Sequence, residues 1–256
     1  MRILITNDDG IHSPGLDALE KIAREISDDV WVVAPETDQS GVAHSLSLND
    51  PLRLRRIGEK KFAVKGTPTD CVILASRHIM KNDVPELLLS GVNRGHNLGE
   101  DVTYSGTVAG AMEGALLGIP AIALSQGYPS GTREAVDYSS ALTHGAAVIG
   151  RVLEAGLPSG GLANVNFPPR PAAQVAGVRA TRQGQRAQWQ TRIDERRDGR
   201  NNPYFWIMIG HESGDPEADT DLKAVAEGYI SVTPLKIDMT DVALKATFDA
   251  AIEGKL

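Results

Sequence analysis

The chain has 256 residues, of which 41% are apolar and 23% charged, which is typical of one large α/β domain or of one domain with an appendage. Its formal net charge of −7 argues against general binding of long nucleic acids or anionic membranes. The single cysteine, Cys71, excludes an intrachain disulfide and a cysteine-based zinc cluster, and we expect a cytoplasmic protein. No apolar run reaches the roughly 20 residues of a membrane-spanning helix, so we expect no membrane partner.

The first part of the chain alternates between short apolar runs and amphipathic segments. Residues 2–6 are rich in β-branched side chains and predict a strand buried on both faces, as in a parallel sheet. Apolar residues recur at helical spacing over residues 15–27, and residues 30–35 predict the next strand. This strand–helix–strand order predicts a parallel sheet with right-handed crossovers.

The following elements extend this pattern. Residues 51–57 and 60–66 predict a half-exposed strand pair, and residues 67–80 predict a helix with Thr67 as its cap and Pro68 in its first turn. Further strands are expected at 86–91, 119–125 and 161–168, the last as a candidate for the final strand of the central sheet, and helices at 105–118 and about 134–155. The predicted fold is a three-layer α/β/α, Rossmann-like architecture with a mostly parallel sheet.

The character of the chain changes at about residue 172, where it becomes polar and weakly periodic. Seven arginines lie from Arg179 to Arg200, and Asp198-Gly199 before an apolar run predicts a protruding β-hairpin arm. A two-stranded arm rarely stabilises itself, so we expect it to pack on another subunit. Residues 227–238 and 240–254 predict a strand and an amphipathic helix. We therefore divide the chain into an α/β catalytic core (1–171) and an oligomerisation segment (172–256).

Three polar loops are expected at the carboxyl ends of the predicted strands, where open α/β sheets bind ligands. They are Asn7-Asp8-Asp9-Gly10, the stretch that ends in Ser40-Gly41, and residues 90–107. These loops supply carboxylates, hydroxyls and amide carbonyls, but no cysteine and no histidines at zinc-ligand spacing. An all-oxygen set of this kind is typical of a site for Mg²⁺, Mn²⁺ or Ca²⁺.

The third loop leads into a helix at Ser105-Gly106-Thr107. A helix start with these residues offers free backbone N–H groups and hydroxyl donors, which together form a ready site for an anion. A divalent cation that faces a phosphate cradle indicates metal-assisted phosphoryl chemistry.

The residues by themselves leave other interpretations open. Adjacent aspartates such as Asp8 and Asp9 also suit a turn after a strand. Ser40 could act as a covalent nucleophile, but that role needs a positioned base. Ser105 also suits a helix N-cap, and one geometry can serve both capping and phosphate binding.

Four long stretches resemble the SurE family of survival proteins, which are metal-dependent 5′/3′-nucleotidases. They occur in the family's order and spacing across residues 1–125, and they are MRILITNDDGIHSPG, VVAPETDQSG, KGTPTDCV and SGVNRGHNLGEDVTYSGTVAGAMEG. Several long motifs together are far more specific than an isolated Asp-Asp pair. The second half of the chain fits the family more loosely, in its length and its arginine-rich arm.

The resemblance implies a function and a set of site residues. It implies one divalent cation per subunit, Mg²⁺ or Mn²⁺ with Ca²⁺ able to occupy the site, held by Asp8, Asp9, Ser40 and Asn93. The positions that match the family's phosphate site are Asn7, Asn97, Ser105, Gly106 and Thr107. The implied substrates are nucleoside 5′- and 3′-monophosphates, with short polyphosphates or oligonucleotide ends in some members. The implied assembly is a homodimer or homotetramer built through the hairpin and the C-terminal segment.

The resulting hypothesis is in-line attack of water on phosphorus, in which Asp8 or Asp9 accepts the proton. Two alternatives remain at this stage. The first is a phosphatase that forms an aspartyl-phosphate, although the two aspartates of the haloacid-dehalogenase pattern are spaced by one residue and these are adjacent. The second is a receiver-like, nucleotide-sensing regulator that binds Mg²⁺ without turnover, and the anion site at residues 105–107 argues against it.

Overall fold

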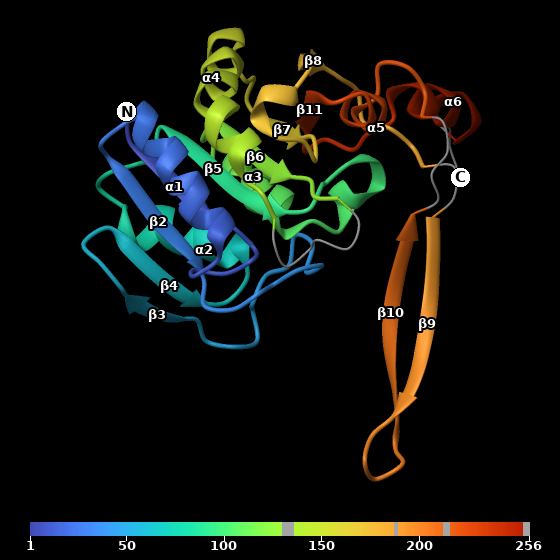
Figure 1. The fold of residues 1–256 in the computed structure, drawn as a ribbon, viewed down its shortest axis with the longest axis horizontal. Helices are drawn as coiled ribbons and strands as arrows, with labels where there is room; N and C mark the ends of the chain where they lie inside the picture. Colours follow the sequence, from blue (N-terminus) through green and yellow to red (C-terminus); the bar gives the residue numbers. More distant parts are fainter. Residues whose placement is uncertain (130–135, 187–188, 212–215, 253–256) are drawn as a thin grey trace.

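A computed structural model describes residues 1–129, 136–186, 189–211 and 216–252 of the protein. Its centre is a nine-stranded sheet with the order β3-β4-β2-β1-β5-β6-β7-β11-β8 (Figure 1). The strands are β1 (Ile3–Thr6), β2 (Val30–Pro35), β3 (Arg53–Arg56), β4 (Lys61–Lys65), β5 (Leu87–Arg94), β6 (Ala121–Gln126), β7 (Gly161–Phe167), β8 (Gly177–Ala180) and β11 (Tyr229–Lys236). Neighbouring strands are parallel except in the β3–β4 and β7–β11 pairs.

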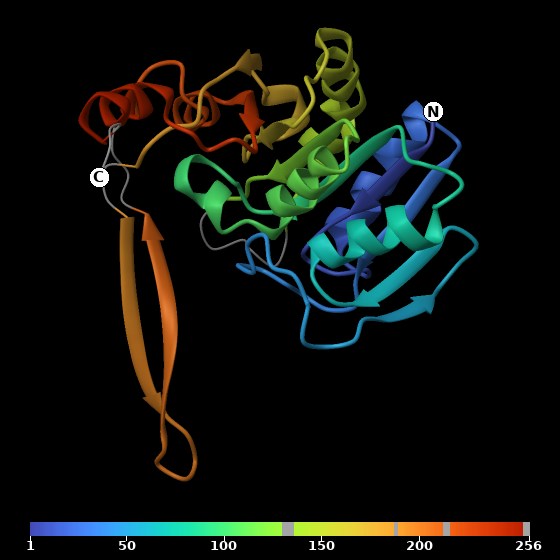
Figure 2. The same ribbon diagram turned by 180° about the vertical axis from the view of Figure 1, so that it is seen from behind.

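Helices cover both faces of this sheet, as the opposite views in Figures 1 and 2 show. Helices α1 (Pro14–Ile26) and α4 (Ser139–Ala155) pack with one apolar cluster, and α2 (Pro68–Leu74) and α3 (Gly106–Leu116) pack with the other. Alternate residues of β1 supply both clusters, since Ile3 and Ile5 face α1 while Leu4 lies with α2 and α3. The predicted three-layer α/β/α architecture is confirmed.

Helix α1 begins where the sequence predicts it. The Ser13 hydroxyl accepts a hydrogen bond from the main-chain N–H of Leu16, and Pro14 occupies the first turn, where no N–H is needed. The buried side of the helix is formed by Leu16, Ala18, Leu19, Ile22 and Ala23. This cap fixes the start of α1 directly after the first polar loop.

The helix predicted over residues 67–80 begins as expected but changes its geometry. Thr67 and Asp70 form a reciprocal capping box at the start of α2. After Leu74 the chain continues as a single π-helical turn (Ala75–Ile79), which the main-chain N–H of Met80 closes by bonding to Ala75 O. Met80 is fully buried, so this wider turn ends with its side chain in the core.

Strand β5 is longer than the predicted strand at 86–91. Its register against β6 shifts between Ser90 and Asn93, after which Asn93 pairs with Ser125 and Arg94 with Gln126. The strand thereby carries Asn93 and Arg94 to the carboxyl edge of the sheet. Helix α4 starts at Ser139, later than expected, and residues 130–135 of the predicted range lie outside the described residues.

The central sheet does not end at β7, so the expectation that 161–168 forms its last strand is wrong. Strand β11 pairs antiparallel with β7, and β8 pairs parallel with β11. The physical reason is visible in β7 itself, in which all residues are buried, because a strand covered on both faces also needs neighbours on both edges. Part of the segment 172–256 thus completes the core sheet, while its role in oligomerisation stays a prediction.

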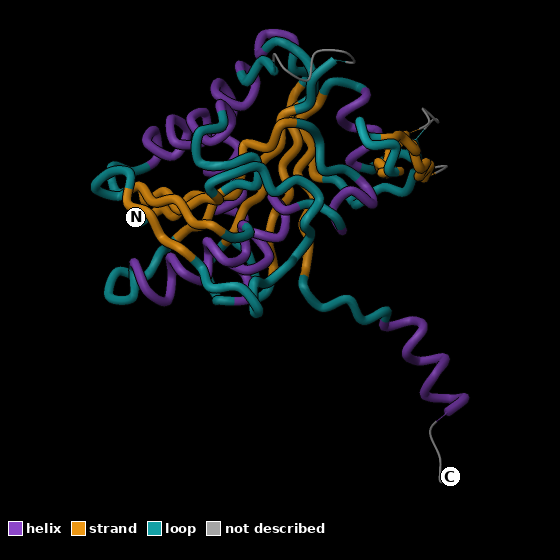
Figure 3. The backbone as a smooth tube through the Cα atoms, turned by 90° about the horizontal axis from the view of Figure 1, so that it is seen from below, coloured by secondary structure: helices purple, strands orange, loops and turns teal. Residues whose placement is uncertain are grey.

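The predicted hairpin arm is confirmed as a separate two-stranded sheet of β9 (Trp189–Arg197) and β10 (Pro203–His211) that projects from the body (Figure 1). Its turn is wider than a two-residue Asp-Gly turn. Asp198 and Asn202 flank it, and Asn201, with φ of 66°, rather than Gly199 adopts the left-handed conformation. Helix α6 (Val242–Ile252) also extends away from the body (Figure 3).

Three short helical segments complete the fold: two 3₁₀ segments (Gly99–Thr103 and Ala172–Gln174) and α5 (Asp221–Ala226). Across the residues that the structure describes, no helix combines the length and the apolar composition that crossing a membrane requires.

Candidate active site

A pocket of about 160 Å³ lies where the carboxyl ends of β1 and β5 meet the start of α3. Its lining residues are Asp8, Ser40, Gly41, Asn93, Arg94, Asn97, Asp101, Tyr104 and Ser105. All three predicted loops therefore contribute to one pocket. The structure brings Asp8, Ser40, Asn93, Asn97 and Ser105 together there, although they are far apart in the sequence.

Asp8 is a buried carboxylate on the pocket wall. Its Oδ1 accepts a hydrogen bond from the Thr107 hydroxyl at 2.5 Å, and its main-chain oxygen accepts one from Gln39 N at 2.7 Å. Burial raises the pKa of Asp8 from 3.8 to about 7, and the nearby charge of Asp9 adds to this rise. In the part of the chain that the structure describes, no cationic side chain pairs with Asp8.

Asp9 is held by Arg94, the residue that follows Asn93. Its Oδ2 accepts a hydrogen bond from Arg94 N at 2.9 Å, and Arg94 Nε lies 3.7 Å from its Oδ1. The same guanidinium lies 3.4 Å from Asp38 Oδ2, and Asp38 Oδ1 accepts hydrogen bonds from both the N–H and the hydroxyl of Ser40. Of the four predicted metal ligands, Asp8, Ser40 and Asn93 line the pocket, and Asp9 is not among its lining residues.

The bridging role of Arg94 and Asp38 was not predicted from the sequence. The signal for Asp38 was present, because an aspartate two residues before a serine commonly accepts hydrogen bonds from the following backbone. The contact of Arg94 with Asp9 joins positions 85 residues apart and has no local signature.

The second loop is also fastened to α2 and α3. Asp70 accepts hydrogen bonds from the N–H and the hydroxyl of Ser47, at 3.1 and 2.6 Å. His44 Nε2 lies 3.0 Å from Glu113 Oε2. These contacts fix the chain on the C-terminal side of Ser40 and so limit the positions that its hydroxyl can take.

The two asparagines of the third loop are oriented by different partners. Asn93 Nδ2 donates to Gly95 O at 2.9 Å, which leaves the amide oxygen as the acceptor for a cation. Asn97 Nδ2 donates to Ser125 Oγ at 2.8 Å, and the Asn97 main chain is held by Asn164 and Asn166. The amide of Asn97 is therefore fixed on the pocket wall.

The start of α3 contributes in three distinct ways. Ser105 caps the helix by accepting from Val108 N at 3.0 Å, so its hydroxyl proton remains available to a ligand. A Cβ on Gly106 would lie 2.8 Å from the Asp8 Cβ, so only glycine fits there. Thr107 is fully buried and directs its hydroxyl at Asp8 instead of lining the pocket.

Asn7, also expected at the phosphate site, is not a lining residue. Its Nδ2 donates to Gly10 O at 3.0 Å and to Ser13 Oγ at 2.7 Å. It thus ties the Asp8–Asp9 loop to the cap of α1. Its predicted role at the phosphate site stays a prediction.

The donor set fits a hard divalent cation. The predicted ligands Asp8, Asp9, Ser40 and Asn93 offer oxygen atoms, and no cationic side chain among the described residues pairs with the buried Asp8 carboxylate. Within residues 1–129, 136–186, 189–211 and 216–252, no group of three or more His, Cys, Asp or Glu side chains is arranged to hold a metal. A cation held here would therefore rely on few protein charges and keep positions for water or phosphate oxygens.

His96 is a half-buried neutral group next to Asn97 in the third loop. Its Nε2 lies 2.9 Å from Phe167 O, and burial lowers its pKa from 6.5 to about 4. Between these two values the unfolded chain binds a proton that the folded protein does not, so stability is lost as the pH falls from 6.5 to 4. We expect His96→Gln to weaken this loss, measured by urea unfolding at pH 7, 6, 5 and 4.

The matched control for His96 is the exposed His12. His12→Gln should leave the pH dependence of the unfolding free energy as in the wild type. A His96→Gln protein that loses stability between pH 6.5 and 4 as steeply as the wild type would contradict the assignment.

Comparisons with known proteins agree with this geometry. The family model described as Survival protein SurE matches residues 3–190. A protein of Methylorubrum extorquens named 5′-nucleotidase SurE is 61% identical over 254 residues, covering 99% of this chain and 100% of that protein. Another of that name, from Methylobacterium nodulans, is 63% identical over 241 residues, covering 94% and 95%.

A solved structure extends the likeness to three dimensions. The crystal structure of the SurE protein from Aquifex aeolicus is 40% identical, with a TM-score of 0.83, and the match covers 98% of this chain and 99% of that one. The sequence motifs, the fold and these full-length likenesses lead to one conclusion. The chain belongs to the SurE family.

Proposed function

We propose that this protein is a metal-dependent nucleotidase that hydrolyses nucleoside 5′-monophosphates to nucleoside and phosphate. Relatives at about 60% identity over the whole chain carry the name 5′-nucleotidase, which supports the activity. The proposal extends to nucleoside 3′-monophosphates and short polyphosphates as substrates, with Mg²⁺ or Mn²⁺ as the metal, one per subunit. A cytoplasmic location remains a prediction.

One observation carries the proposal: a buried carboxylate, with no cationic partner in the described part of the chain, lies in the same pocket as a hydroxyl donor at a helix start. Asp8 supplies the carboxylate and Ser105 the hydroxyl. The first favours a bound cation and the second favours an anion. A phosphate monoester between them satisfies both, because its oxygens bind the cation on one side and the donors on the other.

The residues of the pocket have separate parts in the reaction. A bound divalent cation would offset phosphate charge and lower the pKa of water, and Asp8, Asp9, Ser40 and Asn93 would hold it. The Ser105 hydroxyl, the free N–H groups of α3 and the Asn97 amide orient the phosphate oxygens and stabilise charge that develops on them. One carboxylate of the Asp8–Asp9 pair accepts the proton of the attacking water.

The first test is removal and return of the metal. After chelation with EDTA we expect phosphate release from AMP and 3′-AMP to stop, and we expect Mg²⁺ or Mn²⁺ to restore it, since the carboxylates alone repel the substrate. A colorimetric phosphate assay measures this. Full activity in EDTA, or no phosphate release with either metal, would overturn the proposal. A trapped phosphoryl group on Asp8 or Asp9 would favour the aspartyl-phosphate mechanism instead.

We also propose that the protein is a homodimer or homotetramer in which the arm packs on another subunit. In the single chain, the apolar run on β10 is exposed on both of its faces, with Phe205, Trp206 and Ile207 exposed by 58%, 55% and 69%. Ile193 lies directly opposite Ile207 and is exposed by 61%. A surface of this kind is typical of an interface.

Sedimentation at micromolar concentration tests the assembly. We expect a mass of two or four chains for the wild type and a smaller mass for Ile207→Lys, because a charge would be buried without a partner in the interface. Ile207→Val is the matched control and should keep the wild-type mass. A monomeric wild type would contradict this part of the proposal.

A further inference from the structure

The pocket carries one more carboxylate than the proposed chemistry uses. Among the residues that the structure describes, the charged ones that line it are Asp8, Arg94 and Asp101. Asp8 belongs to the predicted metal site, and Arg94 already pairs with Asp9 and Asp38 outside the lining. Asp101 therefore adds negative charge to the wall that an anionic substrate approaches.

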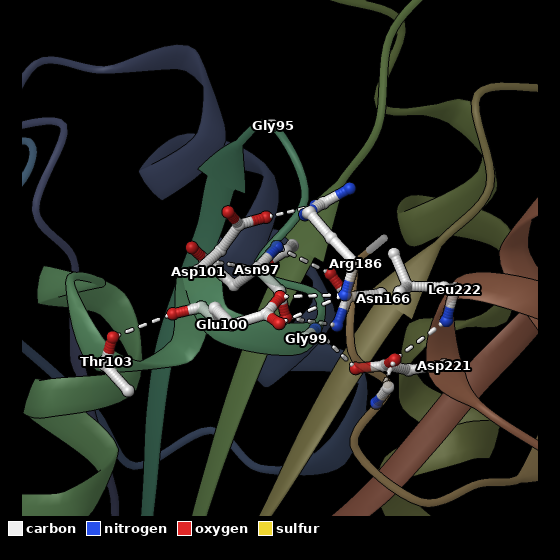
Figure 4. A network of polar contacts seen from close by, with 12 residues as sticks. Gly95, Asn97, Gly99, Glu100, Asp101, Thr103, Asn166, Arg186, Asp221 and Leu222 are labelled. Atoms are coloured by element: carbon white, nitrogen blue, oxygen red, sulfur yellow. Dashed lines mark hydrogen bonds and ion pairs between the residues drawn. The ribbon is translucent and has the colours of Figure 1, made fainter. Parts of the chain in front are cut away.

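Arg186 supplies that positive charge from the segment that leads into the arm. Its Nη2 lies 2.5 Å from Asp101 Oδ2, and the two side chains are only 14% and 16% exposed. The main-chain N–H of Arg186 also donates to the Glu100 carboxylate, at 3.0 and 3.2 Å from its two oxygens (Figure 4). Arg186 is thus fixed on two consecutive acidic residues of the loop that carries the phosphate donors.

A buried aspartate keeps the two segments in this arrangement. Asp221 is fully buried, and its two carboxylate oxygens accept from Gly184 N at 2.8 Å and from Gly99 N at 2.9 Å. Gln183 Nε2 adds a hydrogen bond to Gly99 O at 2.9 Å. Figure 4 shows Asp221, Gly99 and Arg186 side by side at this junction. The position of Arg186 is therefore set by a hydrogen-bonded framework.

We propose that Arg186 is a positioning residue for substrate binding: its guanidinium neutralises Asp101 on the pocket wall and so permits a phosphate dianion to approach Asn97 and Ser105. This inference rests on the proposed function, since it concerns a phosphate ligand in the same pocket. Arg186 itself does not line the pocket and acts through Asp101. Replacing Arg186 removes a positive charge that lies in contact with the largely buried Asp101 carboxylate, which is the origin of the expected effect.

The test is a double-mutant cycle of Arg186→Gln and Asp101→Asn. The readouts are KM and kcat for AMP with Mg²⁺, and the Kd of inorganic phosphate by calorimetry, each at low and high salt. We expect Arg186→Gln to raise KM and this Kd about tenfold at low salt, equivalent to about 1.4 kcal/mol, with little change in kcat. The increase should shrink at high salt, and the double variant should return to near the wild type.

Arg182 provides the matched control. It lies four residues earlier and pairs with Glu217 and Asp219 at the surface, and none of the three lines the pocket. Arg182→Gln should leave KM and the phosphate Kd unchanged. A similar rise in both arginine variants would show a general charge effect and would overturn the inference.

Two further outcomes would overturn the role of Arg186. One is wild-type phosphate binding in Arg186→Gln. The other is weakened binding that persists in the double variant, which would leave Arg186 with a purely structural role. If Arg186→Gln fails to fold, Asp101→Asn alone decides: we expect tighter phosphate binding than in the wild type, and unchanged or weaker binding contradicts the inference.

A different result would overturn the proposed nucleotidase activity. It is lost if the metal-loaded wild type releases no phosphate from AMP, while the phosphate Kd of the variants still tests Arg186.

Discussion

Replacing Asp8 by asparagine should greatly reduce activity and should stabilise the metal-free protein. The amide still accepts the hydrogen bond from Thr107 but removes the charge that would hold a cation, so we expect kcat/KM for AMP to fall by roughly a thousandfold. Burial raises the pKa of Asp8 from 3.8 to about 7, so above pH 7 the folded metal-free protein contains an unfavourable buried charge. The neutral amide of the Asp8→Asn variant would relieve that cost.

The sign of the pH dependence follows from proton binding. Between pH 3.8 and 7 the folded protein keeps a proton on Asp8 that the unfolded chain has released, so the Asp8 contribution to stability falls as the pH rises. We therefore expect Asp8→Asn to be more stable than the wild type in EDTA. The gain in the free energy of unfolding should be larger at pH 8 than at pH 4. Thermal unfolding at both pH values, together with phosphate release, measures the two effects.

The control for Asp8 is Asp28→Asn, at an exposed position, which should change neither activity nor stability. Wild-type activity in Asp8→Asn would remove Asp8 from the site. Lower stability than the wild type at pH 8 in EDTA would show that Asp8 is compensated by a charge after all.

The second large effect is expected from Gly106→Ala. The new methyl group would lie 2.8 Å from Asp8 Cβ and 2.9 Å from Asp8 Oδ2, and real Cβ contacts are not this short. To relieve this short contact, either Asp8 or the start of α3 must move. Either movement changes the distance between the Asp8 carboxylate and the Ser105 hydroxyl. We expect kcat/KM for AMP to fall by about a hundredfold or more, since catalytic geometry tolerates little displacement.

The matched control for Gly106→Ala is a glycine-to-alanine change at Gly150 in α4. A Cβ on Gly150 would meet no atom within 4 Å, so Gly150→Ala should keep full activity and raise the free energy of unfolding by up to about 1 kcal/mol. Thermal unfolding of both variants separates a displaced site from a destabilised fold. Unimpaired catalysis in Gly106→Ala would show that the contact with Asp8 does not set the geometry of the pocket.

Much of the fold could be predicted because its elements have local causes. The strand at residues 2–6 and the helix that begins at Pro14 follow from a β-branched run, a serine cap and a proline in the first turn. Parallel strands with crossover helices then leave few topologies. The completion of the sheet by β11 and β8 could not be predicted, because the pairing of β7 with a strand more than 60 residues later has no local signal.

The sequence by itself determined the three-layer architecture, the hairpin arm and the three loops whose oxygen-bearing side chains meet at one pocket. These depend on periodicity, turn residues and side-chain chemistry, which are properties of short segments. Only the tertiary structure decided the positions of the predicted site residues. Ser105 lines the pocket, Thr107 donates a hydrogen bond to Asp8, and Asn7 donates one to Ser13. It also decided that Arg186 pairs with Asp101, because charges 85 residues apart interact only once folding has brought them together and removed water from between them.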